Sequence, residues 1–190
     1  MSAKGRPERE LLPPGGRARS AKGAPRSASD AIPAPRYPAK IATYADALKR
    51  ARNLPRPLVF TNGVFDVLHR GHVTYLDQAR SLGASLVVAV NSDESVRRLG
   101  KDRDRPLNPL EDRMSVLAAL ASVDLVVPFE TDTPRDLIAA CLPDVLVKGG
   151  DYTAATTAGA AEVAAAGGKF VAIPFASAHS TTALVERIRR

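Results

Sequence analysis

The chain has 190 residues, of which 45% are hydrophobic and 25% are charged. These values are typical of a globular protein with one buried core. No run approaches the about 20 consecutive apolar residues that a membrane span needs, and the N-terminus lacks the apolar core of a secretory signal. We therefore expect a cytoplasmic protein without a membrane segment, in which the single cysteine, Cys141, lies in the core.

The net charge of +7 is concentrated at the N-terminus. Residues 1–36 hold eight Lys and Arg against three acidic residues, which leaves only +2 for the remainder. Residues 1–38 are rich in Pro, Gly, Ala, Ser and Arg without clustered apolar residues, so this segment cannot offset the entropy of ordering. We predict a disordered basic tail over 1–38 and one domain over 39–190. A solvated extension is favoured over a weak polyanion-binding arm, and nothing indicates specific nucleic-acid recognition.

Short β-branched runs alternate with helical patterns along the rest of the chain. Helical spacing over 44–52 is followed by five predicted strands, at 58–60, 86–90, 125–127, 145–147 and 170–173. Further helices are predicted at 71–82, 94–99, 109–121, 133–141, 158–166 and 181–189. This alternation predicts an α/β fold with a doubly wound, mainly parallel five-stranded sheet. Ligands of such sheets bind beyond the carboxyl ends of the strands.

The segment from Asn62 to His72 is a predicted strand-to-helix loop that contains two of the three histidines. His69 and His72 lie three residues apart where the helix begins, and Gly63 and Gly71 allow the backbone to approach a phosphate closely. Two side-chain donors and free backbone amides would form a phosphate-binding loop. From the residues alone, a helix cap or a surface position explains the histidines equally well, and a zinc site would need further ligands.

This loop resembles a known signature. Residues 63–72 have the Gly-x-Phe-Asp-x-Leu-His-x-Gly-His form found in the cytidylyltransferase-like nucleotidyltransferase superfamily. The resemblance extends over 41–190, because other family segments follow in order at 91–93, 105–106, 111–114, 123–124, 148–152 and 180–182. Within the superfamily, the chain is most similar to the bacterial adenylyltransferases of ADP-heptose synthesis.

The resemblance implies a Rossmann-like fold and a reaction. Such enzymes transfer AMP from ATP to D-glycero-beta-D-manno-heptose 1-phosphate, giving ADP-heptose and pyrophosphate for lipopolysaccharide or capsule precursors. ATP would bring Mg²⁺ with it, and a homo-oligomer, a dimer or larger, is expected. In-line attack of a phosphate oxygen on the α-phosphorus requires positioning and charge neutralisation more than a general base. The histidines would then act as charged donors to the triphosphate.

The resemblance also assigns roles to individual residues. The catalytic residues would be His69, His72 and Lys148. The nucleotide would be bound by Asn62, Gly63, Phe65, His69, His72, Asn91, Arg113, Lys148, Ser180, Thr181 and Thr182. The acceptor sugar phosphate would be bound by Asp66, Asp93 and Gly149, and no metal site built by the protein is expected.

Several of these residues have simpler explanations when the resemblance is set aside. Asp93 suits the N-cap of the helix at 94–99, and Ser180 suits the N-cap of the last helix. Arg113 lies one turn into a helix that Pro109 opens, where it would be solvated. Asp66 lies in a tight loop, where it would orient backbone amides.

Two other functions fit parts of the sequence. A CTP-dependent cytidylyltransferase acting on glycerol phosphate or another alcohol phosphate would share the His-x-Gly-His loop. That branch carries an Arg-Thr-x-Gly-Ile-Ser type segment before its last helix, whereas this chain has no arginine at 176–182. A non-catalytic nucleotide-binding or RNA-binding module that uses the basic tail is the alternative from another class.

Overall fold

The computed structural model describes residues 32–100, 104–174 and 181–188. Residues from Pro35 onward form one compact unit, which begins with a short 3-10 helix, η2 (Tyr37–Lys40), that we did not predict. Most of the predicted tail, 1–38, lies outside the described residues, so its disorder stays a prediction. No helix in the described part of the chain is long and apolar enough to cross a membrane.

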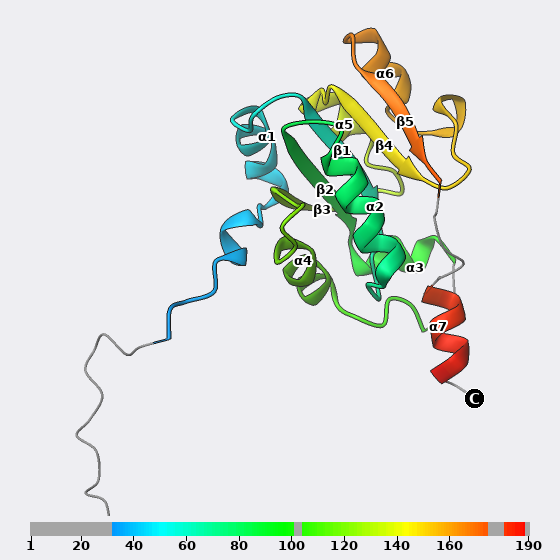
Figure 1. The fold of residues 1–190 in the computed structure, drawn as a ribbon. Coiled ribbons are helices and arrows are strands. Elements are labelled where there is room, and N and C mark those ends of the chain that lie inside the picture. The colour runs from blue at the N-terminus through cyan, green and yellow to red at the C-terminus, as the bar shows by residue number, and fades with distance from the viewer. Residues whose placement is uncertain (1–31, 101–103, 175–180, 189–190) are drawn as a thin grey trace, which may run out of the picture. The chain divides into compact units, whose positions relative to one another are not determined.

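A five-stranded parallel sheet forms the centre of this unit (Figure 1). Its strands are β1 (Leu58–Gly63), β2 (Ser85–Asn91), β3 (Leu125–Phe129), β4 (Val145–Gly149) and β5 (Lys169–Ile173). They are arranged in the order β3-β2-β1-β4-β5, and every neighbouring pair is parallel. The predicted doubly wound, parallel α/β fold is therefore confirmed.

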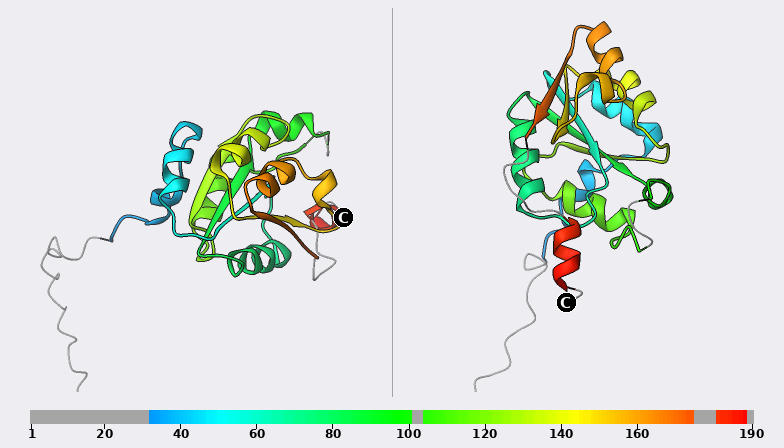
Figure 2. Two further views of the ribbon diagram at one scale, coloured as in Figure 1. Left: turned by 90° about the horizontal axis from the view of Figure 1, so that it is seen from above. Right: turned by 90° about the vertical axis from the view of Figure 1, so that its right-hand side faces the viewer.

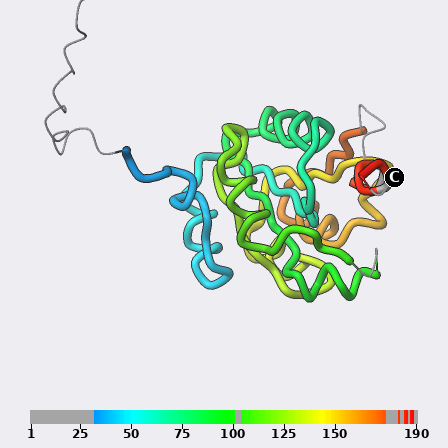
Figure 3. The backbone as a smooth tube through the Cα atoms, turned by 90° about the horizontal axis from the view of Figure 1, so that it is seen from below, coloured from blue at the N-terminus to red at the C-terminus, as the bar shows by residue number. Residues whose placement is uncertain are grey.

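Helices lie on both sides of the sheet, as the turned views show (Figures 2 and 3). One face packs against α1 (Tyr44–Arg52), α5 (Arg135–Cys141) and α6 (Ala160–Ala165), and the other against α2 (Arg70–Arg80) and α4 (Leu110–Ala118). The remaining helices are α3 (Asp93–Arg98), η3 (Ala154–Thr156) and α7 (Thr181–Ile188). Cys141 is buried in the first of these two layers, as predicted.

The two hydrophobic layers follow from the alternation of side chains along each strand. In β1, Phe60 packs on the side of α1 and α5, whereas Val59 packs on the side of α2 and α4. Strands that bury both faces need apolar residues at nearly every position, which explains the continuous runs in the sequence. This burial is the main source of stability for the fold.

Local backbone conformation sets the helix ends that the sequence patterns misplace. The helix predicted at 158–166 begins at Ala160, because Gly159 has a φ of +85° and serves as its N-cap. Only glycine adopts this left-handed conformation at little cost. Ser92, rather than Asp93, caps α3, because its side chain accepts a hydrogen bond from the Ser95 amide.

The strand order reverses between β1 and β4. Thr61 pairs with Val147, so the carboxyl ends of these strands, at Asn62–Gly63 and Lys148–Gly149, lie side by side. Crossover connections leave in opposite directions from such a pair of strands and open a crevice above them. The fold therefore brings the His-x-Gly-His loop close to the Lys148 segment, although His72 and Lys148 are 76 residues apart in sequence.

Candidate active site

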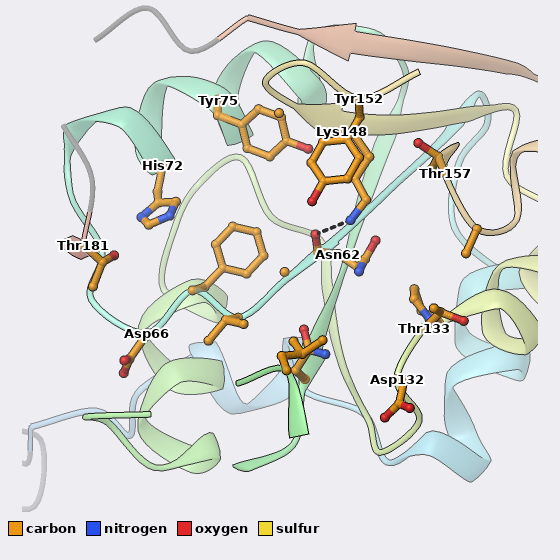
Figure 4. A pocket seen from close by; sticks show the side chains of 18 of the residues that line it. Asn62, Asp66, His72, Tyr75, Asp132, Thr133, Lys148, Tyr152, Thr157 and Thr181 are labelled. Carbon is orange, nitrogen blue, oxygen red and sulfur yellow. Dashed lines mark hydrogen bonds between the residues drawn. The ribbon is translucent and has the colours of Figure 1, made fainter. Parts of the chain in front are cut away.

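A cleft of about 590 Å³ lies at the carboxyl ends of the strands (Figure 4). Its wall is formed by residues 62–66, 132–134, 148–149 and 156–158, together with His72, Tyr75, Asn91, Leu99, Arg105, Tyr152, Thr181 and Val185. Most of these residues lie at the ends of β1, β2 and β4, in the loops that follow the strands, or in the helices that come next. The cleft therefore occupies the position that the parallel sheet predicts for a ligand.

Phe65 fixes the shape of the loop that follows β1. Its backbone has a φ of +48°, an uncommon conformation for a bulky residue, and its side chain is buried. A Cβ atom on Gly63 would lie 3.0 Å from the Phe65 ring, so glycine permits this close packing. The ring also makes an edge contact with His72, with ring centroids 5.5 Å apart. Phe65 therefore supports the position of His72.

His69 is the N-cap of α2. Its Nδ1 accepts a hydrogen bond from the Gly71 amide at 3.1 Å, which satisfies one of the free donors of the first turn. Its ring stacks on that of His72, with centroids 4.0 Å apart and planes inclined by 25°. His69 is not part of the cleft wall among the described residues. The helix-cap explanation is therefore confirmed for His69, and its role as a donor to the triphosphate stays a prediction.

His72 is part of the cleft wall. Burial, together with the proximity of His69, lowers the pKa of His72 to about 4, although a hydrogen bond with the Val67 backbone opposes the shift. Its Nδ1 is buried and has no hydrogen-bond partner within the described ranges. Buried polar nitrogens are nearly always satisfied by protein, water or ligand, so this atom is available to a molecule bound in the cleft. In the free protein the ring is neutral at pH 7, in contrast to the charged form expected with a triphosphate.

Lys148 connects the ends of β4 and β1. Its Nζ donates to the backbone oxygen of Asn62 at 3.3 Å and lies 5.2 Å from the centre of the Tyr152 ring. The side-chain Oδ1 of Asn62 is buried and has no partner among the described residues. Figure 4 shows Lys148 and Asn62 at the centre of the cleft, where the dashed line marks their contact. The cleft thus presents an ammonium group and an unsatisfied acceptor.

Asp66 lines the cleft, but its carboxylate contacts the 105–108 segment. Its side chain is fully buried, accepts from the amides of Leu107 and Asn108 at 2.9 and 2.8 Å, and forms an ion pair with Arg105. The simpler explanation, orientation of backbone amides, agrees with these contacts, and acceptor binding by Asp66 stays a prediction.

Arg113 lies beneath the site rather than in the cleft wall of the described residues. Its side chain has 0% exposure, so solvation, the simpler explanation for Arg113, is wrong. The guanidinium donates to the backbone oxygens of Val64, Asn91 and Asn108 and to the Asp93 carboxylate, at 2.7 to 3.0 Å. These four contacts join the ends of β1 and β2 to α4, and nucleotide binding by Arg113 stays a prediction.

Asp93 is engaged by Arg113 and is not in the cleft wall of the described chain, so acceptor binding by Asp93 is not supported. Asn91 does line the cleft, while its amide group donates to Ser95 Oγ at 2.9 Å. Gly149 also lines it, beside Lys148. The residues predicted for nucleotide or acceptor binding at the strand ends therefore line the cleft, namely Asn62, Gly63, Asn91, Lys148 and Gly149.

Thr181, the first residue of α7, lines the cleft and its Oγ1 donates to the Val67 oxygen at 3.4 Å. Figure 4 places Thr181 on the same side as His72. Ser180 and the side chain of Thr182 lie outside the described residues, so their predicted phosphate contacts stay predictions. The start of α7 next to the His-x-Gly-His loop fits a phosphate site at a helix N-terminus.

Sequence reasoning missed several residues of the cleft. Tyr75 lies one helical turn after His72, and its hydroxyl bonds to Thr61 Oγ1 at 2.6 Å. The spacing of His72 and Tyr75 on one helix face was a usable signal. The other missed residues are Arg105, Asp132, Thr133, Tyr152, Thr156 and Thr157. Asp132, Thr133 and Thr157 lie opposite His72 and Thr181 in Figure 4, so one side of the cleft carries hydroxyl and carboxylate groups.

Comparison with known proteins agrees with this geometry. Residues 60–187 match the cytidylyltransferase-like family. The D-beta-D-heptose 1-phosphate adenylyltransferase of Bordetella bronchiseptica is 60% identical over 157 residues, which cover 82% of this chain and 97% of that protein. The bifunctional protein HldE of Yersinia enterocolitica is 55% identical over 143 residues, which cover 75% of this chain but only 30% of HldE.

Solved structures show the same fold. A lipopolysaccharide core biosynthesis protein from Thermoplasma volcanium is 26% identical with a TM-score of 0.52, covering 64% of this chain and 98% of that one. A pantothenate synthetase from Thermus thermophilus is 17% identical with a TM-score of 0.51, covering 71% and 61% of the two chains, and shows the fold alone.

The fold, the cleft and the His-x-Gly-His loop define a nucleotidyltransferase. The chain belongs to the cytidylyltransferase-like family, in the branch that contains the heptose 1-phosphate adenylyltransferase of Bordetella bronchiseptica. The predicted family resemblance is confirmed.

Proposed function

We propose that this enzyme transfers AMP from ATP to a heptose 1-phosphate, forming ADP-heptose and pyrophosphate. The observation that carries the proposal is the unpartnered Nδ1 of His72 in the wall of a cleft that also holds Lys148. A buried ring nitrogen that becomes a donor when the ring is protonated, in the same cleft as an ammonium group, suits a phosphate chain. The 60% identity to an enzyme named for this reaction supports the same substrate.

The reaction is an in-line displacement. An oxygen of the sugar phosphate forms a bond to the α-phosphorus of ATP, and the bond from that phosphorus to the α,β-bridging oxygen breaks. Its electron pair leaves with pyrophosphate. The attacking phosphate oxygen is already deprotonated, so the protein has to orient two anions and reduce their repulsion.

His72 and Lys148 supply the donors for this step. A bound triphosphate would raise the pKa of His72 from about 4 toward the charged form, in which both ring nitrogens donate, so that Nδ1 can donate to a phosphate oxygen. Lys148 adds a positive charge between the ends of β1 and β4. His69 holds the first turn of α2 and, through stacking, the His72 ring.

Magnesium would arrive as the MgATP complex and would supply positive charge that stabilises the departing pyrophosphate. No group of three or more His, Cys, Asp or Glu side chains suited to a metal occurs in the described part of the chain. Of the two carboxylates in the cleft wall, Asp66 is already paired with Arg105, and Asp132 with Arg98. Phosphate oxygens and water would therefore supply most ligands of the ion.

The hydroxyl and carboxylate side of the cleft suits the hydroxyl groups of a sugar. Thr133, Tyr152 and Thr157 each offer a hydroxyl that donates and accepts hydrogen bonds. We place the reaction in the cytoplasm, where ATP is available, with a product that serves lipopolysaccharide or capsule synthesis. A homo-oligomer remains part of the proposal, and light scattering on the purified protein tests it.

The decisive experiment measures pyrophosphate release with magnesium and D-glycero-beta-D-manno-heptose 1-phosphate, using ATP, CTP, GTP and UTP in separate reactions. We expect release with ATP and a product with the mass of ADP-heptose. Release only with CTP and glycerol phosphate would move the chain to the cytidylyltransferase alternative. Absence of turnover with every pair, in a protein that still binds ATP, would favour the non-catalytic alternative.

A further inference from the structure

Arg105 has a position in the cleft that the sequence analysis did not predict. It precedes α4 in the chain, its side chain is 12% exposed, and it belongs to the cleft wall. Most arginine side chains extend into solvent, so a nearly buried guanidinium at the edge of a ligand cleft needs a reason. Its surroundings provide one.

Asp66 holds Arg105 in this position. The Asp66 carboxylate is fully buried and forms an ion pair with the Nε of Arg105. The same carboxylate accepts from the amides of Leu107 and Asn108, so the chain on the C-terminal side of Arg105 is fixed as well. The Asn108 backbone oxygen in turn accepts from Arg113. The β1 loop thus fixes both the backbone near Arg105 and one edge of its guanidinium.

The remaining donors of Arg105 suit an anion. A guanidinium has five N–H donors, and the ion pair with Asp66 is formed by Nε. Nε has no hydrogen-bond partner within residues 32–100, 104–174 and 181–188, so its contact with the carboxylate is ionic. The two terminal nitrogens form the planar fork that binds a phosphate with two parallel hydrogen bonds.

We propose that Arg105 is a further substrate-binding residue, whose terminal nitrogens bind a phosphate group of ATP or of the acceptor sugar phosphate, while Asp66 acts as its positioning residue. Figure 4 places Asp66 on the side of the cleft that carries His72 and Thr181, which is the side we assign to phosphates. The inference rests on the proposed function, because both candidate ligands are substrates of that reaction.

The test compares steady-state kinetics of the wild type with Arg105→Gln and Arg105→Lys, varying ATP and heptose 1-phosphate separately. We expect Arg105→Gln to raise the KM of one substrate by roughly ten- to hundredfold, the usual scale for a charged hydrogen bond. Arg105→Lys keeps the charge but loses the pair of terminal nitrogens, so its KM should lie between those of the wild type and Arg105→Gln. A rise for ATP, matched by its calorimetric Kd, assigns the triphosphate, and a rise for the sugar assigns the acceptor phosphate.

The double variant Asp66→Asn/Arg105→Gln separates binding from folding. It removes the buried carboxylate charge that Arg105→Gln alone would leave unpaired, so its melting temperature should exceed that of the single variant. We expect its KM to stay raised. The matched control is Arg135→Gln, which removes a guanidinium paired with Glu162 on the surface of α5, away from the cleft wall, and should keep wild-type kinetics.

Two outcomes would overturn the inference. One is wild-type KM values for both substrates in Arg105→Gln, and the other is recovery of wild-type KM values in the double variant, which would make the effect structural. A wild-type protein that binds ATP but forms no ADP-heptose would contradict the proposed function instead, and the calorimetric Kd of ATP would still report on Arg105.

Discussion

The ring of His69 lies stacked on the ring of His72, with centroids 4.0 Å apart, while its own Nδ1 accepts from the Gly71 amide. The two histidines of one short motif therefore have different tasks. His69 closes the first turn of α2 and supports its neighbour, whereas His72 belongs to the cleft wall. This division gives the first prediction.

Replacing His72 with Ala should leave the fold intact but lower kcat by about a hundredfold or more, the scale for losing one transition-state donor. The ring is half-buried at the cleft, so its removal deletes no core contact of the sheet. Pyrophosphate release measures kcat, and circular dichroism measures the fold. Wild-type turnover in a folded His72→Ala protein would remove the proposed mechanism.

His69 should show a separable effect on stability. His69→Ala removes the N-cap of α2 and should cost about 1 kcal/mol in the free energy of unfolding, whereas His69→Asn keeps a good capping side chain and should cost less. Both variants lose the ring that stacks on His72, so both should lower kcat. Urea unfolding compares the pair, and equal stability of the two variants would contradict a capping role.

The depressed pKa of His72 makes stability depend on pH. The pKa is 6.5 for an ordinary histidine and about 4 for His72 in the folded protein, mainly because of burial. Between these pH values the unfolded chain binds the proton more tightly than the folded protein does. The contribution of neutral His72 to the free energy of unfolding is therefore fully present above pH 6.5 and decreases as pH falls toward 4. Replacing His72 with Asn should flatten the curve of unfolding free energy against pH over this window.

Urea unfolding at several pH values between 7 and 4, on wild type and His72→Asn, checks this prediction. All other titrating groups are shared by the two proteins, so the difference between their curves isolates His72. A difference that does not change with pH would show that the folded and unfolded proteins bind this proton equally.

We expect Arg113 to contribute more to the stability of the fold than to substrate binding. Replacing it with Met leaves the Asp93 carboxylate and three backbone oxygens without their donor, and loss of one partner of a buried pair costs about 3 to 5 kcal/mol. The control Arg135→Met breaks an exposed pair with Glu162 and should change the stability far less. An Arg113→Met protein of wild-type stability with a raised KM for ATP would instead support nucleotide contact.

Lys148 should be needed for turnover more than for folding. Replacing it with Met keeps the length of the side chain but removes the charge between the ends of β1 and β4, so kcat should fall strongly. The control is Lys169→Met, at an exposed position on the edge strand β5, which should keep wild-type kcat. Equal kinetics of the two variants would exclude a role for Lys148 in the reaction.

The domain boundary predicted at residue 38 can be tested against the compact unit that begins at Pro35. Lys40 Nζ donates to the Leu120 oxygen at 2.9 Å, and the Ala42 amide donates to Val126. Deleting residues 1–34 should therefore preserve both melting temperature and kcat, whereas deleting 1–42 should lower the melting temperature. Loss of activity on the shorter deletion would show that the basic segment contributes to the enzyme.

Much of the fold could be predicted because its signals are local. The five strands are contiguous β-branched runs, and the His-x-Gly-His loop is a contiguous segment between a strand and a helix. Errors occurred at helix ends, as at Ala160, where a single left-handed glycine decides the start. Such ends depend on backbone conformation, which periodicity does not report.

The parallel sheet, the place of the cleft and the position of the His-x-Gly-His loop follow from the sequence, because hydrophobic period and motif spacing are carried by adjacent residues. Tertiary contacts were needed to show which histidine lines the cleft, that Arg113 is internal, and that Asp66 forms an ion pair with Arg105. These roles depend on contacts between segments 20 to 49 residues apart, which the crossover connections bring together. A side chain's chemistry is fixed by its type, but its role is fixed by the partners that folding places around it.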